Sequence, residues 1–419
     1  MNIVANAVWV ASAFDGLKDL DSFLHSGAAY TRGLDPYDYY AWLRPEPISP
    51  EALNLNPPIS VYLFEPLSAM DRGLVGTGFF VGSVAMVGAA VGLLMRAYPE
   101  KRTWLVVLIV AGMAGIWHML WYLQIYAPLL LAMTGAWLLM RRGDWVLAGI
   151  LIGLMIAVKP NYAVLALVLV AAGHYRPAVT AVVTAGLISL VPLLIDGPEI
   201  YWQWLHMTIG FEGYEWASNA SLISVGERLN IAPLGQIAGA SLTLAVLFFV
   251  WRRRPGALDA MALGLMTVIL VGPVSWAGYT LLLLPFLFSM RWDGWTWVSI
   301  AILVAPFAPG GAFGALGVDL PALFSGSGQG AFVPVPSVMM AIVSAIAMPL
   351  IGAIYAWGVL LLLVRLIQRL SAEQEGSVDV ALPRLPRVVM VRPARPPRTP
   401  IEGEPLHQQP ATIRVRYDA

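Results

Sequence analysis

Residues 15–72, DGLKDLDSFLHSGAAYTRGLDPYDYYAWLRPEPISPEALNLNPPISVYLFEPLSAMDR, form the one long polar stretch of an otherwise apolar chain. The stretch holds nine carboxylates against four basic residues, and aromatic residues and prolines recur along it. Disordered linkers are poor in aromatic residues, so we expect an ordered loop. We expect this loop to lie on the outer face of a membrane, to carry a reactive carboxylate, and to close a cavity built by the helices that follow.

The composition of the chain is that of a polytopic membrane protein. Apolar residues make up 58% of it, charged residues make up 12%, and the mean hydropathy is +0.72. A soluble domain, in contrast, usually carries about a quarter charged residues. With 419 residues and roughly 20 residues per span, the sequence predicts an all-α bundle of about 12 transmembrane helices.

The charge balance and the reactive side chains narrow the function. A formal net charge of zero argues against a nucleic-acid partner. The chain has no cysteine, which excludes disulfides, thiol nucleophiles and Cys-ligated metals. None of the five histidines is paired at ligand spacing, so we expect no metal site and no other cofactor.

Apolar runs divide the rest of the chain into expected helices. Several runs are shorter than a full span and fit broken or half-buried helices. The clearest break is at Lys159-Pro160, because proline cannot donate to the helix ladder and restricts the residue before it. Residues 1–14 are also too short to span comfortably, so either the first helix is partly interfacial or the true start lies upstream. The later runs are 74–95, 103–119, 124–140, 144–158, 161–173, 177–195, 233–251, 256–274, 276–290, 294–308 and 336–364, interrupted by a polar segment at 196–232 and a Gly/Pro-rich segment at 309–335.

The placement of lysine and arginine predicts the orientation of the helices, since cytoplasmic loops carry an excess of both. Strict alternation puts twelve basic residues on one side and six on the other. We therefore expect a multi-pass protein of the inner or plasma membrane with both termini in the cytoplasm. Residues 15–72 and 196–232 would form the active-site side, facing the periplasm or exterior.

The last part of the chain differs from the rest. Residues 371–419 are rich in proline and arginine and have little to bury, which is typical of disordered segments. We therefore divide the chain into a transmembrane domain, 1–370, and a disordered cytoplasmic tail, 371–419. The tail is expected either to be simply solvated or to touch anionic lipid headgroups.

Two carboxylates at the start of the polar stretch, Asp19 and Asp21, are candidates for a general base. If residues 19–31 form a helix, the two lie on different faces, and Asp19 shares its face with Phe23. A carboxylate beside an apolar wall can have a raised pKa and act as a base. The alternative is that both are solvated loop carboxylates, or that they favour the helix dipole.

Two basic residues on the predicted outer side could hold an anion. Lys159 lies between two apolar half-runs, where an ionisable residue is a functional candidate by default, although it could equally snorkel to the interface. Arg228 could hold two phosphate oxygens at once or pair with a neighbouring glutamate. His118 and Gln124 flank an outer turn, where they either line a cavity or form interhelical hydrogen bonds.

Five segments form an ordered set of motifs. They are DLDSFLHSGAAYTRGLDPYD (19–38), NLNPPISVYLFEPLSAMD (54–71), RRGDWVLAGILIGLMIAVKPNYAVLAL (141–167), SNASLISVGERL (218–229) and GPVSWAGYTLLLLPFLF (272–288). In this order they resemble glycosyltransferase family 87, which comprises polytopic GT-C enzymes and includes the polyprenyl-phosphomannose-dependent mannosyltransferases of phosphatidylinositol-mannoside synthesis. Each segment alone is a weak signal, whereas the ordered set is fairly specific.

The resemblance implies a GT-C-type membrane glycosyltransferase. Its donor would be a polyprenyl-phosphate-linked sugar, such as mannose or arabinose, and its acceptor a glycolipid or polysaccharide. Asp19 opens the Asp-Leu-x-x-aromatic pattern and would be the catalytic base of an inverting transfer, with Asp21 as the second candidate. Lys159 and Arg228 would face the donor phosphate. The residues expected to line the substrates are Asn56, Gln124, Asn219, Ser221, Trp276 and Tyr279.

The chain departs from the family pattern at two places. Members often have a histidine after Ser-Trp, where this chain has Ala277, and the family's Gly-Gln-x-Asn is reduced to Leu123-Gln124-Ile125-Tyr126. The missing histidine favours an alternative function as a non-catalytic membrane protein, either an exporter component or a scaffold. The near-absence of charges within the spans favours the enzyme, since a transporter should depend on such residues.

Overall fold

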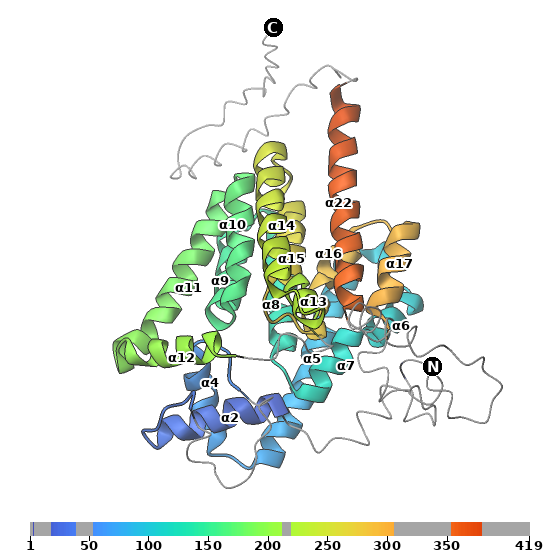
Figure 1. Ribbon diagram of the computed structural model, residues 1–419. Coiled ribbons are helices and arrows are strands. Elements are labelled where there is room, and N and C mark those ends of the chain that lie inside the picture. Colours follow the sequence, from blue (N-terminus) through green and yellow to red (C-terminus); the bar gives the residue numbers. More distant parts are fainter. Residues whose placement is uncertain (1–2, 4–17, 39–52, 212–218, 306–352, 379–419) are drawn as a thin grey trace, which may run out of the picture. The chain divides into compact units, whose positions relative to one another are not determined.

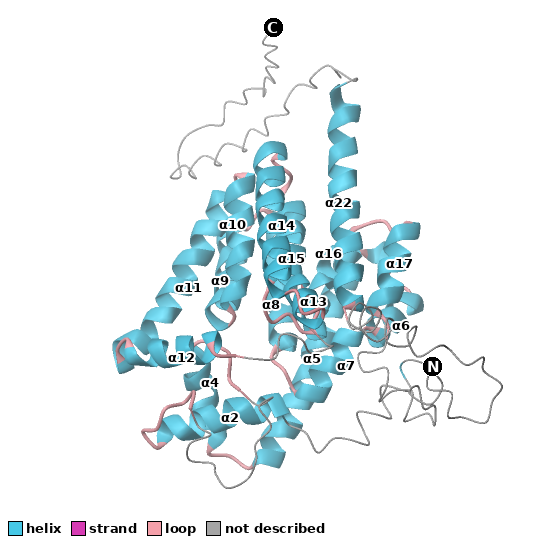
Figure 2. Cartoon of the chain, viewed as in Figure 1, coloured by secondary structure: helices cyan, strands magenta, loops and turns pink. Residues whose placement is uncertain are grey.

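The computed structural model describes residue 3 and residues 18–38, 53–211, 219–305 and 353–378. The chain divides into two units, Met1–Ala372 and Glu373–Ala419, and the description below concerns the first. In the described parts of this unit the secondary structure is helical, as Figures 1 and 2 show, and the one β-type pairing is an isolated bridge between Asn219 and Trp276. The predicted all-α class is therefore confirmed for these residues.

The described helices are named here in their order along the chain. The α-helices are α2 (Lys18–Thr31), α4 (Ile59–Ser68), α5 (Arg72–Ala97), α6 (Trp104–Gly112), α7 (Ala114–Tyr122), α8 (Tyr126–Arg142), α9 (Trp145–Val158), α10 (Ala163–Ala172), α11 (Tyr175–Asp196), α12 (Glu199–Ile209), α13 (Leu222–Arg228), α14 (Ala232–Arg253), α15 (Ala257–Val271), α16 (Leu284–Ser289), α17 (Gly294–Leu303) and α22 (Ile354–Val378). Three short 3₁₀ helices are η1 (Pro99–Lys101), η2 (Pro160–Tyr162) and η3 (Ala277–Leu283).

Local sequence explains where several helices begin and end. The side chains of Asp71 and Thr103 accept hydrogen bonds from backbone N–H groups in the first turns of α5 and α6, which satisfies donors that have no partner within the helix. Gly143 and Gly173 end α8 and α10 at φ values of 85° and 92°. Glycine adopts this left-handed conformation without the steric cost that a side chain would add.

Helices α8, α9, α10, α11, α14 and α15 pack side by side, and α2, α4 and α12 lie at one end of them (Figure 1). Helix α15 is enclosed, with every side chain from Ala260 to Leu270 buried. Helices α11 and α14 instead expose large apolar side chains, namely Val179, Val182, Val183, Leu187, Leu190, Leu194, Leu234, Ile237, Leu244, Phe248 and Trp251. Apolar surfaces of this extent suit contact with lipid rather than water.

By length and composition, four of the described helices can each cross a membrane. They are α5, α11, α14 and the part of α22 up to Glu373. Helices α6 and α7 are bent by 48° at the break between them and together would make a fifth span. The remaining apolar helices of the described residues are shorter. The four or five candidate spans are those of a membrane protein. The predicted total of about twelve transmembrane helices stays a prediction.

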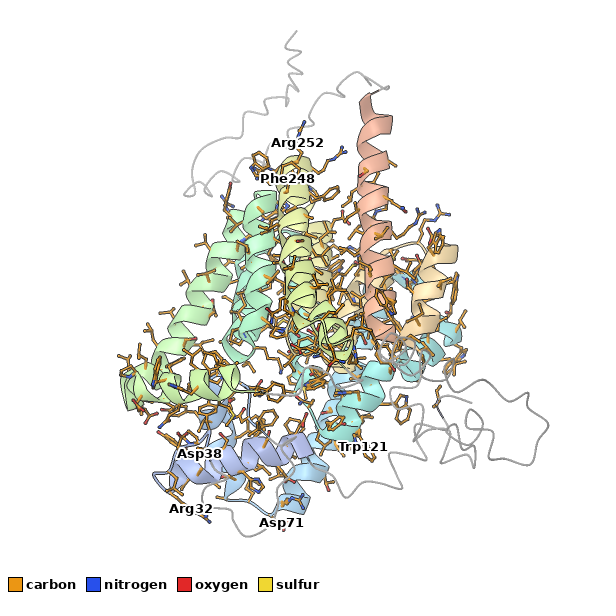
Figure 3. The ribbon with its side chains drawn as sticks, in the orientation of Figure 1. Arg32, Asp38, Asp71, Trp121, Phe248 and Arg252 are labelled. Carbon is orange, nitrogen blue, oxygen red and sulfur yellow. The ribbon has the colours of Figure 1, made fainter. Side chains whose placement is uncertain are left out.

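Labelled charged residues that were predicted for different sides lie at opposite ends of the bundle. Figure 3 shows Phe248 and Arg252 near one end of α14, and Arg32, Asp38 and Asp71 at the far end, around α2 and the start of α5. This separation is the one expected from alternating helices. Which end faces the cytoplasm remains a prediction from the Lys and Arg count.

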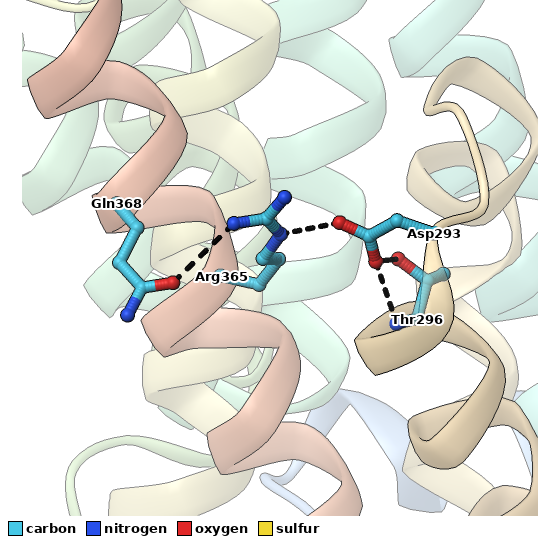
Figure 4. Close-up of polar contacts among 4 residues, drawn as sticks. All are labelled: Asp293, Thr296, Arg365 and Gln368. Carbon is cyan, nitrogen blue, oxygen red and sulfur yellow. Dashed lines mark hydrogen bonds and ion pairs between the residues drawn. The ribbon is translucent and has the colours of Figure 1, made fainter.

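Helix α22 is tied to its neighbours by ion pairs. Arg365 pairs with Asp293, which also accepts hydrogen bonds from the Thr296 backbone N–H at 2.9 Å and the Thr296 hydroxyl at 2.8 Å (Figure 4). The backbone N–H of Thr296 is the main cause that holds the pKa of Asp293 below its ordinary value. A second pair joins Arg369 to Asp259 at the start of α15.

Several predicted boundaries can be compared with the structure. The break at Lys159-Pro160 is confirmed, because α9 ends at Val158 and η2 begins at Pro160. The polar segment 196–232 contains two helices, α12 and α13, and α22 continues past residue 370 to Val378. The N-terminal run 1–14 (apart from residue 3), the Gly/Pro-rich segment 309–335 and residues 379–419 of the tail lie outside the described residues.

Close helix contact at Gly149 and Gly153 yields a stability prediction. A Cβ added to Gly153 would lie 2.6 Å from both the Ala181 carbonyl oxygen and the Thr184 Cβ on α11, whereas one added to Gly186 would have nothing within 4 Å. We expect Gly153→Ala to cost about 1–3 kcal/mol, because overpacking forces the helices apart. Gly186→Ala should be neutral or stabilising by up to about 1 kcal/mol through helix propensity.

Thermal unfolding of the two variants in the same detergent tests this contact. A lower Tm for Gly153→Ala and an unchanged or higher Tm for Gly186→Ala are the expected pair. Equal shifts in the two variants would contradict the close approach of α9 and α11.

Candidate active site

Helix α2 is held firmly against α4. The helix predicted over residues 19–31 is observed as α2. Its Phe23 stacks on Phe64 of α4, with 4.5 Å between the ring centroids. At Gly27 the helices are so close that an added Cβ would lie 2.8 Å from the Glu65 backbone. This packing fixes the face that α2 presents to the bundle.

Asp19 contacts the turn between α7 and α8. The side-chain amide of Gln124 donates a hydrogen bond to a carboxylate oxygen of Asp19. Gln124 follows Leu123, which has the left-handed backbone angles φ 50° and ψ 49°, and its own N–H donates to the Met119 carbonyl at 3.1 Å. A leucine adopts this conformation only where its surroundings enforce it. The turn therefore aims the Gln124 side chain at α2.

Asp21 faces a different partner. Arg72, at the start of α5, donates from Nε and Nη2 to the two carboxylate oxygens of Asp21, forming a bidentate ion pair. Both oxygens of the Asp21 carboxylate are therefore occupied by the guanidinium group. The structure thus separates the two candidate bases and gives Asp21 an anchoring contact between α2 and α5.

Lys159 lies at the helix break in an extended conformation, with φ −140° and ψ 96°. Its Nζ is 5.7 Å from the centroid of the Tyr126 ring and 5.5 Å from that of the Tyr279 ring. No carboxylate among the residues that the structure describes forms an ion pair with Lys159. Aromatic faces attract the ammonium group but carry no net negative charge that would neutralise it.

Three tyrosines, Tyr126, Tyr162 and Tyr279, pack together beside Lys159, and we call them the tyrosine cluster. The Tyr279 ring centroid lies 5.1 Å from that of Tyr126 and 5.8 Å from that of Tyr162. Asn161 donates a hydrogen bond from Nδ2 to the Tyr279 hydroxyl at 3.2 Å. The rings come from α8, η2 and η3, so the cluster exists only when these three elements pack.

Sequence reasoning missed two of these tyrosines and the asparagine. Tyr126 stands two residues after the predicted Gln124, and Asn161 and Tyr162 follow directly after Lys159 and Pro160. Their proximity along the chain was the available signal. It is a weak one, since an aromatic residue at a helix end is common in membrane proteins.

A second set of hydrogen bonds joins residues 219–220 to residues 273–276. Asn219 donates from Nδ2 to the Pro273 carbonyl at 2.8 Å, and its Oδ1 accepts from the Ser275 N–H at 3.0 Å. The Ala220 N–H donates to the Ser275 carbonyl at 2.7 Å. Asn219 is fully buried, so its amide acts as a fixed clamp on the backbone just before Trp276.

Arg228 and Ser221 support the same region. Arg228 donates from Nη2 to the Asn219 carbonyl at 3.1 Å. The hydroxyl of Ser221 accepts from the Ser224 N–H at 3.1 Å and so caps α13. Both side chains therefore hold α13 beside the Asn219 clamp.

His118 of α7 connects the two groups. Its ring centroid lies 6.3 Å from that of Trp276 in a nearly parallel arrangement, and 6.3 Å from that of Tyr126. Tyr126 begins α8 two residues after Gln124, whose amide donates to the Asp19 carboxylate. The structure thereby brings into one region the predicted residues Asp19, Gln124, Lys159, Asn219, Ser221, Arg228, Trp276 and Tyr279.

Asn56 has a different neighbourhood. Its side chain donates to Asn54 Oδ1 at 3.2 Å, and its carbonyl accepts from the Tyr37 hydroxyl at 2.9 Å. The Asn54 amide then donates to the hydroxyls of Ser26 and Ser60. This buried network fixes the Asn-Pro-Pro turn against α2, and the contacts of Asn56 do not join it to the tyrosine cluster.

Comparison with known proteins gives one family and one curated relative. Glycosyltransferase family 87 matches residues 54–273, which is more than half of the chain. A polyprenol-phosphate-mannose-dependent alpha-(1-2)-phosphatidylinositol mannoside mannosyltransferase of Mycobacterium tuberculosis (strain ATCC 25618 / H37Rv) is 25% identical over 308 residues, covering 64% of this chain and 71% of the relative. No solved structure matches. The family match includes Lys159 and Arg228 and begins after α2.

The Asn219 clamp yields a second prediction. Replacing Asn219 by alanine leaves the Pro273 carbonyl and the Ser275 N–H without their partner, at a cost of about 1–3 kcal/mol per buried group. Asn219→Asp retains the acceptor but turns a carboxylate oxygen toward the Pro273 carbonyl oxygen in a fully buried site, so its loss of stability should be at least as large as that of alanine. Thermal unfolding of the three proteins tests this order, and an alanine variant as stable as wild type would contradict it.

His25 of α2 yields a prediction for pH. Burial is the main cause that lowers the pKa of His25 below 6.5, with Asp21 opposing and Arg72 adding to the effect. The unfolded chain therefore binds more protons in acid, so this contribution to stability is complete above about pH 6.5 and is lost as the pH falls below it. We expect His25→Gln to reduce the decrease in Tm between about pH 7 and about pH 5.

The exposed His206 of α12 provides the control. His206→Gln should leave the pH dependence of Tm as it is in wild type. If both variants reduced the acid-dependent decrease in Tm equally, burial of His25 would not be the cause of that decrease.

Proposed function

Because the chain belongs to glycosyltransferase family 87, we propose that this glycosyltransferase takes a sugar from a polyprenyl-phosphate donor. By analogy with the mannosyltransferase relative, the sugar is mannose or a similar hexose or pentose, and the acceptor is a glycolipid or polysaccharide. Transfer takes place on the outer face of the inner or plasma membrane, with both termini in the cytoplasm. The transmembrane domain, residues 1–370, carries the reaction.

The proposed reaction is a single inverting displacement. Asp19 takes the proton of an acceptor hydroxyl, and the acceptor oxygen forms a bond to the anomeric carbon of the donor sugar. The bond between that carbon and the phosphate oxygen breaks, and its electron pair stays on the phosphate. Polyprenyl phosphate leaves, with its charge held by Lys159 and Arg228.

The observation that carries this proposal is the placement of a carboxylate and a cation around one short segment, residues 124–126. Asp19 is hydrogen-bonded to Gln124, two residues before Tyr126, and the Tyr126 ring lies 5.7 Å from Lys159 Nζ. An inverting transfer needs a base on the acceptor side of the anomeric carbon and positive charge on the leaving-group side. Donors aimed at developing negative charge are most effective where water is excluded.

The contacts of Asp19 and Lys159 also support these roles. Asp19 is oriented by the Gln124 amide, as a base must be oriented toward the proton that it takes. Lys159 lacks a carboxylate partner among the described residues and is therefore suited to an anionic substrate. Arg228 reaches the same region through the Asn219 carbonyl.

Family membership favours the enzyme over the non-catalytic scaffold or exporter component. The histidine that family members often have after Ser-Trp is Ala277 here. We propose that Asn219, Ser221, Trp276 and Tyr279 line the substrates together with Gln124, and that Asn56 acts indirectly by shaping the turn beside α2.

Replacing the proposed base provides the test. Asp19→Asn removes the proton acceptor and retains the shape of the side chain, so sugar transfer should fall by about 10²–10⁴-fold. Asp21→Asn, which weakens the ion pair with Arg72, should retain most of the activity of the folded enzyme. Radiolabelled sugar transfer from polyprenyl-phosphate donors into membrane lipid or polysaccharide measures both, at matched expression.

Other outcomes of the transfer assay would change the assignment of the general base or of the donor. Loss of transfer only in Asp21→Asn would move the base to Asp21 and leave the enzyme class unchanged. Well-folded wild type that transfers sugar from no polyprenyl-phosphate donor would refute the proposed donor class.

A further inference from the structure

The tyrosine cluster contains two buried hydroxyl groups with no hydrogen-bond partner among the described residues. Tyr126 and Tyr162 are both fully buried, and neither hydroxyl makes a hydrogen bond there. Leaving a buried polar group unpaired costs about 1–3 kcal/mol, and folded proteins pair the great majority of such groups. The two unpaired hydroxyls belong to one cluster of tyrosine rings, two of which lie beside the Lys159 ammonium group, so they call for a common explanation.

Both tyrosine rings contact the ring of Tyr279. The Tyr279 hydroxyl also has hydrogen-bonding capacity that the described residues do not fill. It accepts a hydrogen bond from Asn161 at 3.2 Å and donates none to the described residues. A tyrosine hydroxyl offers one donor as well as acceptor capacity. Three O–H donors are thus available in one cluster that already holds the ammonium group of Lys159.

The packing of the rings fixes the cluster. A Cβ added to Gly278 would lie 2.3 Å from the Tyr126 ring, so this ring lies directly against the η3 backbone. The Tyr279 ring packs against the rings of both Tyr126 and Tyr162. These rings therefore have little freedom to turn their hydroxyls toward other partners.

The chemistry of the cluster favours an anion rich in oxygen acceptors. It offers hydroxyl donors and a cation with no carboxylate partner among the described residues. A neutral ligand such as water could satisfy the hydroxyls but would leave the charge of Lys159 uncompensated. A phosphate group supplies both the negative charge and several acceptor oxygens.

We propose that the hydroxyls of Tyr126 and Tyr162 donate hydrogen bonds to the phosphate of a lipid-linked sugar donor, beside Lys159. This inference rests on the proposed function and adds two binding residues to it. In the donor, the phosphate is a diester with one negative charge. When the bond to the sugar breaks, the electron pair left on oxygen makes it a monoester that carries about −1.5 to −2 at neutral pH.

This change of charge gives the hydroxyls their function. The single charge of Lys159 matches the donor, and the neutral hydroxyls stabilise the additional charge that develops during transfer. Interactions that strengthen in the transition state raise kcat rather than only tightening binding. The two tyrosines should therefore affect kcat more than the KM for the donor.

Phenylalanine substitutions provide a test in which stability and activity change in opposite directions. Tyr126→Phe and Tyr162→Phe retain the ring and remove an unpaired hydroxyl, so the free protein should be as stable as wild type or more stable. The same variants should lose about 10²-fold in kcat, as when one donor to a developing oxyanion is removed. A purely structural hydroxyl would not produce this combination.

Tyr355 of α22 is the matched control. Its buried hydroxyl donates to the Ala305 carbonyl at 2.9 Å, so Tyr355→Phe breaks a satisfied hydrogen bond. This variant should have a lower Tm than wild type and an unchanged kcat. It therefore shows the effect of the same chemical change away from the cluster.

The experiment measures the Tm of the full-length proteins in detergent with and without added polyprenyl phosphate, inorganic phosphate or phosphatidylglycerol, together with the kinetics of sugar transfer. We expect polyprenyl phosphate to raise the Tm of wild type and of Tyr355→Phe. The increase should be much smaller in Tyr126→Phe and Tyr162→Phe. A smaller increase with inorganic phosphate that also needs the two hydroxyls would support recognition of the phosphate group itself.

Three results would overturn the inference. The first is a wild type that no phosphate compound stabilises. The second is a hydroxyl-dependent increase with phosphatidylglycerol but not with polyprenyl phosphate, which would assign the site to a membrane lipid. The third is sugar transfer by wild type with unchanged kcat in both phenylalanine variants, which refutes the two binding residues and leaves the proposed function intact. If instead polyprenyl phosphate binding needs the hydroxyls but wild type transfers no sugar, the site stands and the proposed reaction fails.

Discussion

The end of α9 at Lys159-Pro160 is the constraint on which the candidate site depends. Proline removes a donor from the helix ladder, so α9 stops at Val158 and the chain turns through η2. The break places an ammonium group beside the rings of Tyr126 and Tyr279, within an apolar bundle where a charge is costly. Lys159 therefore marks the end of a helix and also supplies the cation of the candidate site. No carboxylate among the described residues forms an ion pair with it.

The candidate site also requires that α2 be held at the end of the bundle, because α2 carries Asp19. The stacked rings of Phe23 and Phe64 and the close approach at Gly27 fix α2 on α4. The left-handed turn at Leu123 then brings Gln124 to Asp19. A polar helix outside the spans is thereby joined to the elements that carry the tyrosine cluster. The same arrangement gives α2 two carboxylates with different environments, one oriented by an amide and one paired with an arginine.

Much of the site could be predicted, but not all of it. Lys159 and Arg228 stand out in the sequence because cations are rare on the predicted outer side. Only the family resemblance ranked Asp19 above Asp21, since two carboxylates two residues apart differ only in what other elements bring to each face. Tyr126 and Tyr162 were missed because an aromatic residue in an apolar chain carries no signal of its own. Their relation to Tyr279 depends on the packing of three elements that are distant in sequence.

The sequence by itself determined the class of protein, the helix break and the family, because these follow from composition, from proline chemistry and from motifs in a fixed order. It also predicted that the acidic stretch and the arginine-rich connections lie at opposite ends of the helices. Only the tertiary structure decided which carboxylate faces the bundle, which hydroxyls remain unpaired, and that Asn56 belongs to a separate network. The physical reason is that a local pattern specifies an element and its exposed face, whereas the partner of a side chain is set by the elements that pack against it.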